Sequence, residues 1–341
     1  MPPKPRKRPA TMMDVARHAG VSQTTVSFVV NDVEGVGIPE ETRERIWAAV
    51  SALGYRPNAL AQSLRTQRSG LFGLVTDEIA ITPHAGKIVE GAQDVAWDHE
   101  KILVLINTKN NPKMEKTAIE MLLERQVEGI IYATMYHHSV SPPEELREVP
   151  TVLLDCYTED HSLPSVVPDE VTGGEVATKF MIEKGHRRIG FINNVDPIPA
   201  TSGRLKGYRT ALSAHDLSID ESLIYSETSD PGGGYRGALH LMQLPQPPTA
   251  IFCFNDRMAM GAYDALRKLG RAIPADVAIM GFDNQELIAA HLYPPLTTME
   301  LPHYQMGAWA VNQLLKMIDS SSKVVPVQHK IECQLIERES V

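Results

Sequence analysis

The chain has 341 residues, of which 43% are hydrophobic and 22% are charged, and both values are ordinary for a globular protein. Its length predicts two or three domains. The three cysteines (Cys156, Cys253 and Cys333) lie far apart, which argues against a disulfide framework or a structural zinc site and indicates a reducing compartment. No apolar run approaches the roughly 20 residues that span a bilayer, and no apolar segment follows the basic N-terminus. The sequence therefore predicts a soluble, cytoplasmic protein without a membrane partner.

The formal net charge of −9 is distributed unevenly along the chain. Residues 1–68 contain ten basic and six acidic residues, so this part carries a net charge of +4 and the remainder carries −13. A small basic segment on an acidic body indicates that the segment binds a polyanion. A solvated basic tail gives the same charge count, so charge alone leaves both interpretations open. Residues 1–10 are expected to form a basic, disordered arm.

Residues 11–57 show the pattern of three short helices. Thr11 can cap the first helix, and Ser22 can cap the second after a turn at Gly20. The third helix is expected to begin at Pro39 and to stop at Gly54. The inward face of the second helix consists of valines three and four positions apart: Val26, Val29 and Val30.

The second helix also carries a polar outward face. At about 100° per residue, five side chains cluster there: Gln23, Thr24, Ser27, Phe28 and Asn31. Three short helices with a small shared core, and amide and hydroxyl groups facing outward from the second, are typical of a helix-turn-helix that reads the major groove of DNA. A solvated polar face on a helical hairpin is the alternative interpretation.

Residues 58–69 are predicted to form a hinge helix. A helix of about two turns is marginal in isolation, because ~12–15 residues are needed to sustain one in water. It would need a partner, such as the same segment of a second subunit and a DNA groove beneath both. Leu64 followed by Arg65 suits a minor-groove wedge, in which an apolar side chain unstacks a base step and a cation enters the negative groove. Otherwise, this segment is a linker.

The sequence TMMDVARHAGVSQTTVSFVVN, followed by PEETRERIWAAVSALGYRPNALAQSLR, resembles the headpiece and hinge of the lactose-repressor (LacI/GalR) family. The resemblance implies three base-reading residues, Gln23, Thr24 and Phe28. It also implies contacts with the phosphate backbone from Ser22, Thr25, Asn31, Tyr55 and Asn58. In the hinge, Leu64 matches the leucine that enters the minor groove, with Ala61 at the helix contact just before it.

Phe28 departs from the family pattern. Many members carry an arginine here, which can pair with O6 and N7 of guanine. A phenylalanine cannot make that contact, but it can touch a thymine methyl group or pack on the edge of the headpiece. The base read at this position is therefore expected to differ from that of the arginine-bearing members.

The body of the chain, residues 70–341, alternates short apolar runs with helical patterns. The apolar runs are 71–75, 102–106, 129–133, 151–154, 188–192, 250–254 and 277–282. This alternation predicts an α/β core of two doubly wound parallel-sheet lobes, and the resemblance to the LacI/GalR family implies that these lobes have the architecture of periplasmic binding proteins. The N-lobe is expected at about 70–167 and 299–325, and the C-lobe at about 168–298 and 326–338.

Most of these strands end in a polar residue: Asp77, Asn107, Asp155, Asn193, Asn255 and Asp283. Ligands bind at the carboxyl ends of strands in open α/β sheets. A cleft lined by carboxylates, amides and one arginine suits a small polyhydroxylated ligand, because carboxylates accept hydrogen bonds from hydroxyls and a guanidinium donates two in parallel. For any single residue the alternative is a helix N-cap, and this applies to Asp256 and Asn193 in particular.

The resemblance to the LacI/GalR family extends over the body, in segments such as GRLKGYRTAL, FNDRMAMGAYDAL and VAIMGFDN. It implies four effector-contacting residues: Asp155, Arg204, Asn255 and Asp283. The positions after Pro83, often aromatic in the family, are His84 and Ala85, so no aromatic ring is expected to stack on the ligand from that side. A sugar or sugar derivative is the predicted effector class, and a nucleobase is the alternative.

Enzyme motifs were not found. GGGYRG (232–237) fits a dinucleotide-binding spacing, but it follows SETSDP rather than a buried strand and is interpreted as a loop entering a helix at Tyr235. No nucleophile elbow or zinc-protease motif occurs, and His137 and His138, without a third ligand nearby, are interpreted as surface histidines. The sequence therefore predicts no catalysis, no cofactor and no metal.

Together these features predict a transcriptional repressor. Two subunits would bind a pseudo-palindromic operator in double-stranded DNA, and a small molecule between the core lobes would control binding. The sequence ends without a leucine heptad, which predicts a homodimer without a tetramerisation helix. The alternative is a two-lobed sugar-binding receptor without DNA function, which should carry a signal peptide and no basic headpiece.

Overall fold

The computed structural model describes residues 8, 10–33, 35–56, 68–79, 82, 85–320 and 325–341. The chain divides into two compact units, Met1–Ser69 and Gly70–Val341. The expected start of the core at residue 70 coincides with this division. Most of the predicted hinge helix lies outside the described residues, including Asn58, Ala61, Leu64 and Arg65. In the part of the chain that the structure describes, no helix has the length and apolarity needed to cross a membrane.

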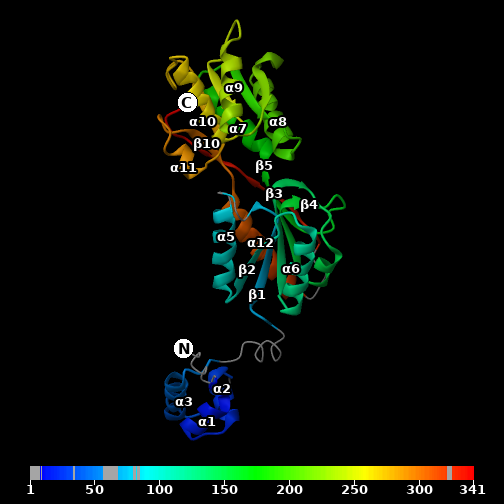
Figure 1. The fold of residues 1–341 in the computed structure, drawn as a ribbon, viewed down its shortest axis with the longest axis vertical. Coiled ribbons are helices and arrows are strands. Elements are labelled where there is room, and N and C mark those ends of the chain that lie inside the picture. Colours follow the sequence, from blue (N-terminus) through cyan, green and yellow to red (C-terminus); the bar gives the residue numbers. More distant parts are fainter. Residues whose placement is uncertain are drawn as a thin grey trace, which may run out of the picture. The chain divides into compact units, whose positions relative to one another are not determined.

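The first unit contains α1 (Met12–Ala19), α2 (Gln23–Val30) and α3 (Glu40–Leu53) (Figure 1). Thr11 caps α1: its side chain accepts from the Asp14 N–H at 3.3 Å, and the Asp14 carboxylate accepts from the Thr11 N–H at 2.9 Å. Such a reciprocal pair satisfies two N–H groups that the helix itself leaves free. The three helices share a small core: Val15, Ala16, Ala19, Val26, Val29, Ile46 and Ala49. This confirms the predicted helix-turn-helix fold.

The N-lobe of the second unit is a sheet of parallel strands in the order β11-β5-β4-β3-β1-β2. The strands are β1 (Leu71–Thr76), β2 (Ile102–Asn107), β3 (Gly129–Ser139), β4 (Thr151–Tyr157), β5 (Ser165–Asp169) and β11 (Gln328–Glu332). The helices α5 (Ala85–Asp98) and α12 (His303–Asp319) cover one face, and α6 (Pro112–Glu124) packs on the other. Burial on both faces explains why β1, β4 and the first half of β3 are nearly continuous apolar runs. The edge strands β2 and β11 are more exposed.

The C-lobe sheet has the order β12-β10-β9-β8-β6-β7, and its strands are parallel except for β12. The strands are β6 (Ile189–Asn194), β7 (Ile224–Glu227), β8 (Ala250–Cys253), β9 (Ala278–Asp283), β10 (Thr297–Glu300) and β12 (Gln334–Ile336). The helices are α7 (Glu170–Glu183), α8 (Pro199–Ala214), α9 (Pro231–Met242), α10 (Asp256–Lys268) and the short α11 (Glu286–Ala289). Two parallel-sheet lobes confirm the predicted fold class.

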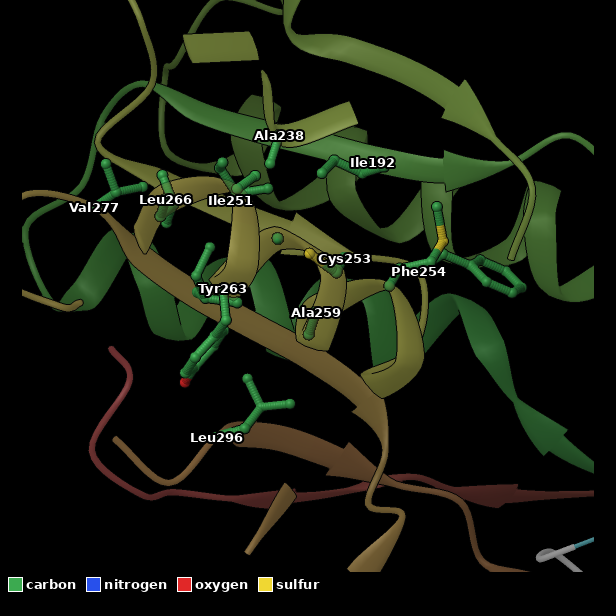
Figure 2. Packing of buried hydrophobic residues seen from close by; sticks show 14 of the residues in the cluster. Ile192, Ala238, Ile251, Cys253, Phe254, Ala259, Tyr263, Leu266, Val277 and Leu296 are labelled. Carbon is green, nitrogen blue, oxygen red and sulfur yellow. The ribbon is translucent and has the colours of Figure 1, made fainter. Parts of the chain in front are cut away.

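Two helices, α9 and α10, cover one face of the C-lobe sheet. Figure 2 shows Ala259, Tyr263 and Leu266 of α10 packed with strand residues Ile251 and Cys253. The opposite face buries a second apolar cluster beneath α7 and α8. Because both faces are covered, polar groups of this lobe can reach a ligand at the strand ends rather than through the faces.

The lobe boundaries differ from the prediction near the C-terminus. The chain was expected to enter the C-lobe at about residue 326, but β11 pairs in parallel with β5 in the N-lobe sheet, with Gln328 opposite Ser165. Only β12 pairs with β10 of the C-lobe. The expected boundary at 298/299 likewise falls inside β10. The reason is long-range strand pairing, which the apolar pattern does not encode.

The segment GGGYRG is helical rather than a loop, since α9 begins at Pro231. Its glycines permit close approach of other backbone segments. A Cβ atom at Gly233 would lie 2.0 Å from the Thr228 carbonyl oxygen, and one at Gly234 would lie 1.9 Å from the Met258 carbonyl oxygen. The glycine pattern therefore serves helix packing, which the spacing alone could not distinguish from a phosphate-binding loop.

Candidate functional site

The outward side of α2 presents short polar side chains at the start of the helix. Ser22 caps α2, with its Oγ accepting from the Thr25 N–H at 3.1 Å and lying 2.8 Å from the Thr25 hydroxyl. Gln23 and Thr24 are exposed, and Phe28 is half-buried. The N-terminal turn of α2 therefore offers an amide and hydroxyl groups to a ligand, with an aromatic ring one turn further along.

The residues expected to contact the DNA phosphate backbone differ in their hydrogen bonds and burial within the first unit. The Asn31 amide donates to the Ser27 carbonyl at 2.7 Å and contacts the Ser27 hydroxyl at 3.2 Å, at the C-terminal end of α2. Tyr55 is half-buried against the small helical core, and this burial raises the pKa of its hydroxyl. Asn58 lies outside the described residues, as do Ala61, Leu64 and Arg65 of the hinge.

The second candidate site is a cavity between the two lobes of the core, at the carboxyl ends of their strands. All four predicted effector-contacting residues line it. Asp155 comes from β4 of the N-lobe, whereas Arg204, Asn255 and Asp283 come from α8, the start of α10 and the end of β9 in the C-lobe. We call this cavity the cleft.

The Arg204 guanidinium is buried and already occupied by other residues of the protein. Its Nε donates to Glu170 at 2.6 Å, its Nη2 donates to the same carboxylate at 3.1 Å, and its Nη1 donates to the Phe254 carbonyl. Asp283 lies 3.5 Å from Nη1, and the Phe282 ring centroid lies 3.7 Å from the guanidinium carbon. Burial alone would lower the pKa of Arg204, but the charges of Glu170 and Asp283 raise it above its usual value.

Asp155 is the carboxyl group of the cleft that lacks a full set of partners. Its side chain is buried and its Oδ1 atom has no hydrogen-bond partner. Its backbone has φ +58°, a left-handed conformation that is rare outside glycine and occurs at functional sites. Burial raises the pKa of Asp155 well above its usual range, and the nearby charge of Glu170 raises it further. Because buried polar atoms are normally satisfied, the Oδ1 atom of Asp155 has an unused capacity for a hydrogen bond.

Asn255 acts as a helix cap. Its Oδ1 accepts from the Met258 N–H at 2.8 Å, and its Nδ2 donates to the Ser229 carbonyl at 3.2 Å. Asp256, suggested as a cap by its sequence position, is instead fully buried and accepts from the Thr298 hydroxyl at 2.6 Å and the Gln285 N–H at 2.7 Å. The capping alternative therefore applies to Asn255 itself.

Of the cleft residues that the sequence patterns did not indicate, Glu170, Arg257 and His137 bear most directly on its chemistry. Glu170 follows β5 and binds Arg204 across 34 positions of sequence. Arg257, in the first turn of α10, lines the cleft with its Nε buried and without a hydrogen-bond partner. The sequence signal that could have identified Arg257 is its position directly after Asn255 and Asp256, at the start of the helix that follows β8.

His137 is the third of these residues, and its interpretation as a surface histidine is wrong. Because β3 continues to Ser139, well beyond the predicted end at residue 133, it carries His137 into the wall of the cleft. Burial lowers the pKa of His137 to about 4, and the charge of Lys330 lowers it further. The imidazole is therefore neutral at neutral pH.

Both parts of the chain match known protein families. Residues 11–58 match the family of bacterial regulatory proteins, lacI family, and residues 178–341 match the periplasmic binding protein-like domain. These ranges contain α1 to α3 of the first unit and nearly all of the C-lobe. The family matches therefore indicate a DNA-binding domain of bacterial regulatory proteins, followed along the chain by a periplasmic binding protein-like domain.

Full-length relatives share both parts. The chain is 35% identical to the HTH-type transcriptional regulator RegA of Clostridium saccharobutylicum, over 97% of this chain and 98% of RegA. It is 32% identical to the HTH-type transcriptional repressor PurR of Proteus mirabilis, over 97% of each protein. Among solved structures, the lac repressor dimer bound to operator and the anti-inducer ONPF matches with a TM-score of 0.81, 26% identity, and coverage of 98% of this chain and 99% of that chain.

Proposed function

Because the chain belongs to the lacI family of bacterial regulatory proteins and is a DNA-binding transcriptional regulator, we propose that it acts as a dimeric repressor controlled by a small molecule in the cleft. The observation that carries this proposal is the combination of two sites in one chain. An exposed polar start of α2 is suited to DNA, and a cleft with an unsatisfied buried carboxyl is suited to a small ligand. A receptor without DNA function would not need the first unit.

In this proposal, the side chains of Gln23, Thr24 and Phe28 contact the edges of the bases in the major groove. An amide can form two hydrogen bonds with adenine, and a threonine methyl group or a phenylalanine ring can contact the methyl group of thymine. Hydrogen bonds to phosphates from Ser22, Thr25, Asn31, Tyr55 and Asn58 would set the register of α2 on the duplex without adding sequence information. In the minor groove, Leu64 would unstack a base step, with Ala61 and Arg65 beside it.

Dimerisation is supported by an apolar edge of the N-lobe. Strand β2 lies at the end of its sheet, where Ile102 and Leu105 are exposed, and Trp97 of the neighbouring α5 is 70% exposed. Exposed apolar side chains on an edge strand favour association with another chain. A pseudo-palindromic operator matches this arrangement, because a two-fold dimer presents the same helix to each half-site.

The effector is proposed to be a sugar or sugar derivative. The Asp155 carboxyl group can form hydrogen bonds with the hydroxyl groups of a sugar. The cleft is also lined by Asn194, Ser229 and the buried pair of Arg204 and Glu170. The two lobes are joined where β5 leads to α7, β10 to α12 and β11 to β12, so a ligand held by both lobes can change their relative rotation. DNA and effector would then favour different core geometries, and the coupling of their affinities must be reciprocal.

A selection from random duplex DNA tests the function. The purified full-length chain, at near-physiological salt and without added small molecules, is expected to enrich one pseudo-palindrome. Gln23→Ala should weaken the base preference at one symmetry-related pair of positions in the selected duplexes, because a side chain that reads a base edge contributes ~1–3 kcal/mol of discrimination between bases. Arg17→Ala, on the exposed side of α1 and paired with Asp14, serves as the control and should leave the selected sequence unchanged. Failure to enrich any sequence would contradict ligand-free repression.

A further inference from the structure

The two cationic side chains that line the cleft differ in how their charge is balanced. Arg204 is held between Glu170 and Asp283. Arg257 has no ion-pair partner among the residues that the structure describes, and its buried Nε has no hydrogen-bond acceptor. Leaving a buried donor of a charged group unsatisfied costs free energy. Arg257 is therefore the cation in the cleft that a ligand could satisfy.

The start of α8 adds a second positive feature to the same wall. This helix begins at Pro199 without a side chain that caps it, and Ile198 and Ala200 at its first turn line the cleft together with Arg257. Pro199 has no N–H and the Thr201 N–H donates to the Ile198 carbonyl at 3.0 Å, so the anion-attracting features of this end are the Ala200 N–H and the helix dipole. The start of α9, in contrast, is capped by the Asp230 carboxylate. The C-lobe wall thus combines an unpaired guanidinium with an uncapped helix end.

The carboxyl groups of the cleft do not neutralise this wall. Three carboxyl groups line it, and two of them, Glu170 and Asp283, already contact Arg204. The third, Asp155, lies on the N-lobe, where burial raises its pKa and favours the uncharged form. An uncharged carboxyl both donates and accepts hydrogen bonds, as a sugar hydroxyl requires. The cleft therefore has a hydroxyl-binding group on one lobe and a cationic group on the other.

We propose that the effector is an anionic sugar derivative, with a phosphate or carboxylate group that binds Arg257 and hydroxyl groups that bind Asp155. This inference rests on the proposed function, because it specifies the ligand class of the cleft. A guanidinium can form two parallel hydrogen bonds with either anion, which fixes its orientation as well as its charge. A neutral sugar would leave the Arg257 charge uncompensated.

Inorganic phosphate is the first probe. Thermal unfolding of the full-length chain is followed in increasing sodium phosphate, with sodium chloride replaced to keep ionic strength constant. We expect a saturable rise in Tm, of roughly 2–3 °C at ten times the Kd. Arg257→Met, which keeps an unbranched apolar stem but removes the guanidinium and its charge, should abolish the rise.

Arg267→Met is the matched control, because Arg267 lies on the last turn of the same helix, is exposed, and pairs with Asp264 at 3.0 Å. It should leave the phosphate response intact. No rise in the wild type, or an equal rise in the Arg257→Met variant, would overturn the inference.

Two anionic sugars show whether the ligand's charged group is a phosphate or a carboxylate. Glucose 6-phosphate and glucuronate are compared with glucose at one concentration, in the wild type and in the Arg257→Met variant. The anion with the larger Arg257-dependent rise in Tm identifies the preferred group as phosphate or carboxylate. A response to glucose that equals or exceeds the responses to both anions counts against an anionic effector.

Failure of this inference is distinguishable from failure of the proposed function. The duplex selection uses no ligand and depends on the first unit, whereas the phosphate measurement uses no DNA and depends on the cleft. A chain that selects a palindrome but does not respond to phosphate keeps its proposed function and loses the anionic effector. A chain that responds through Arg257 but selects no duplex keeps the anion site and loses ligand-free repression.

Discussion

At the scale of single residues, the chemistry of the cleft depends on which charges are already paired. Arg204 resembles a ligand-binding residue in sequence, yet its guanidinium is bound by Glu170 and the Phe254 carbonyl. Arg257 and Asp155 each carry a buried atom without a partner. The paired residues therefore shape and stabilise the cleft, while the unpaired ones are available to a ligand.

Removing one partner of the buried Glu170–Arg204 pair is expected to destabilise the fold strongly. Both side chains are less than a tenth exposed, so Glu170→Gln would leave a buried guanidinium with Asp283 as its remaining counter-charge. Breaking a buried pair costs ~3–5 kcal/mol, and because Asp283 remains we expect a loss of about 2–4 kcal/mol in the free energy of unfolding, measured by urea denaturation. Glu221→Gln, whose pair with Arg209 is exposed, should cost less than about 1 kcal/mol. Equal losses in the two variants would contradict a structural role for Glu170.

At the scale of elements, close contact between α7 and α8 brings Glu170 and Arg204 together. Gly174 of α7 lies against the backbone of Arg204, where an added Cβ would be 2.4 Å from the Arg204 carbonyl oxygen. Gly207 of α8 lies equally close to α7, with an added Cβ 2.2 Å from the Val171 carbonyl oxygen. Small residues on facing helices thus allow the backbone approach that the buried ion pair requires.

Gly207→Ala should separate these helices and destabilise the C-lobe. The obstructing atoms belong to the backbone and cannot rotate away, so we expect a loss of about 1–3 kcal/mol, the usual cost of overpacking. Gly86→Ala is the control, because Gly86 lies on α5 with no atom within 4 Å of an added Cβ. Alanine should be neutral there or should stabilise the helix by up to ~1 kcal/mol. Chemical denaturation compares the two, and unchanged stability in the Gly207→Ala variant would contradict close packing of α7 and α8.

At the scale of the whole molecule, the segment 58–69 joins a DNA-binding unit to a ligand-binding unit. Most of this segment lies outside the described residues, so its role follows from the family resemblance. In the proposed coupling, a rotation of the core lobes reaches the operator through this segment, and Leu64 is the side chain of the segment that is proposed to enter the DNA minor groove.

Leu64→Ala should therefore weaken binding to the selected operator by at least tenfold, because loss of the apolar wedge removes the compensation for unstacking a base step. Fluorescence anisotropy with labelled duplex measures this affinity. Thermal unfolding of the core and its phosphate response should be unchanged, since Leu64 lies outside the core unit. Thr66→Ala, in the same segment, is the control and should retain operator affinity. Unchanged affinity in the Leu64→Ala variant would exclude the wedge.

The sequence by itself determined the features that depend on near neighbours. The side-chain oxygens of Thr11 and Ser22 cap their helices by accepting from N–H groups three positions away. The alternation of apolar runs and helical patterns indicated two parallel sheets. The resemblance to the LacI/GalR family also indicated Asp155, Arg204, Asn255 and Asp283, which the fold brings to one cavity. For Asp155, Asn255 and Asp283 the physical reason is that the carboxyl ends of parallel strands meet at one edge, whereas Arg204 reaches the cavity from α8.

Only the tertiary structure decided the features that depend on distant partners. It placed β11 in the N-lobe through pairing with β5, brought Glu170 onto Arg204, and left Arg257 unpaired in the cleft. The physical reason is that capping and periodicity act over a few residues, whereas strand order and the pairing of buried charges are set by contacts between segments far apart in sequence.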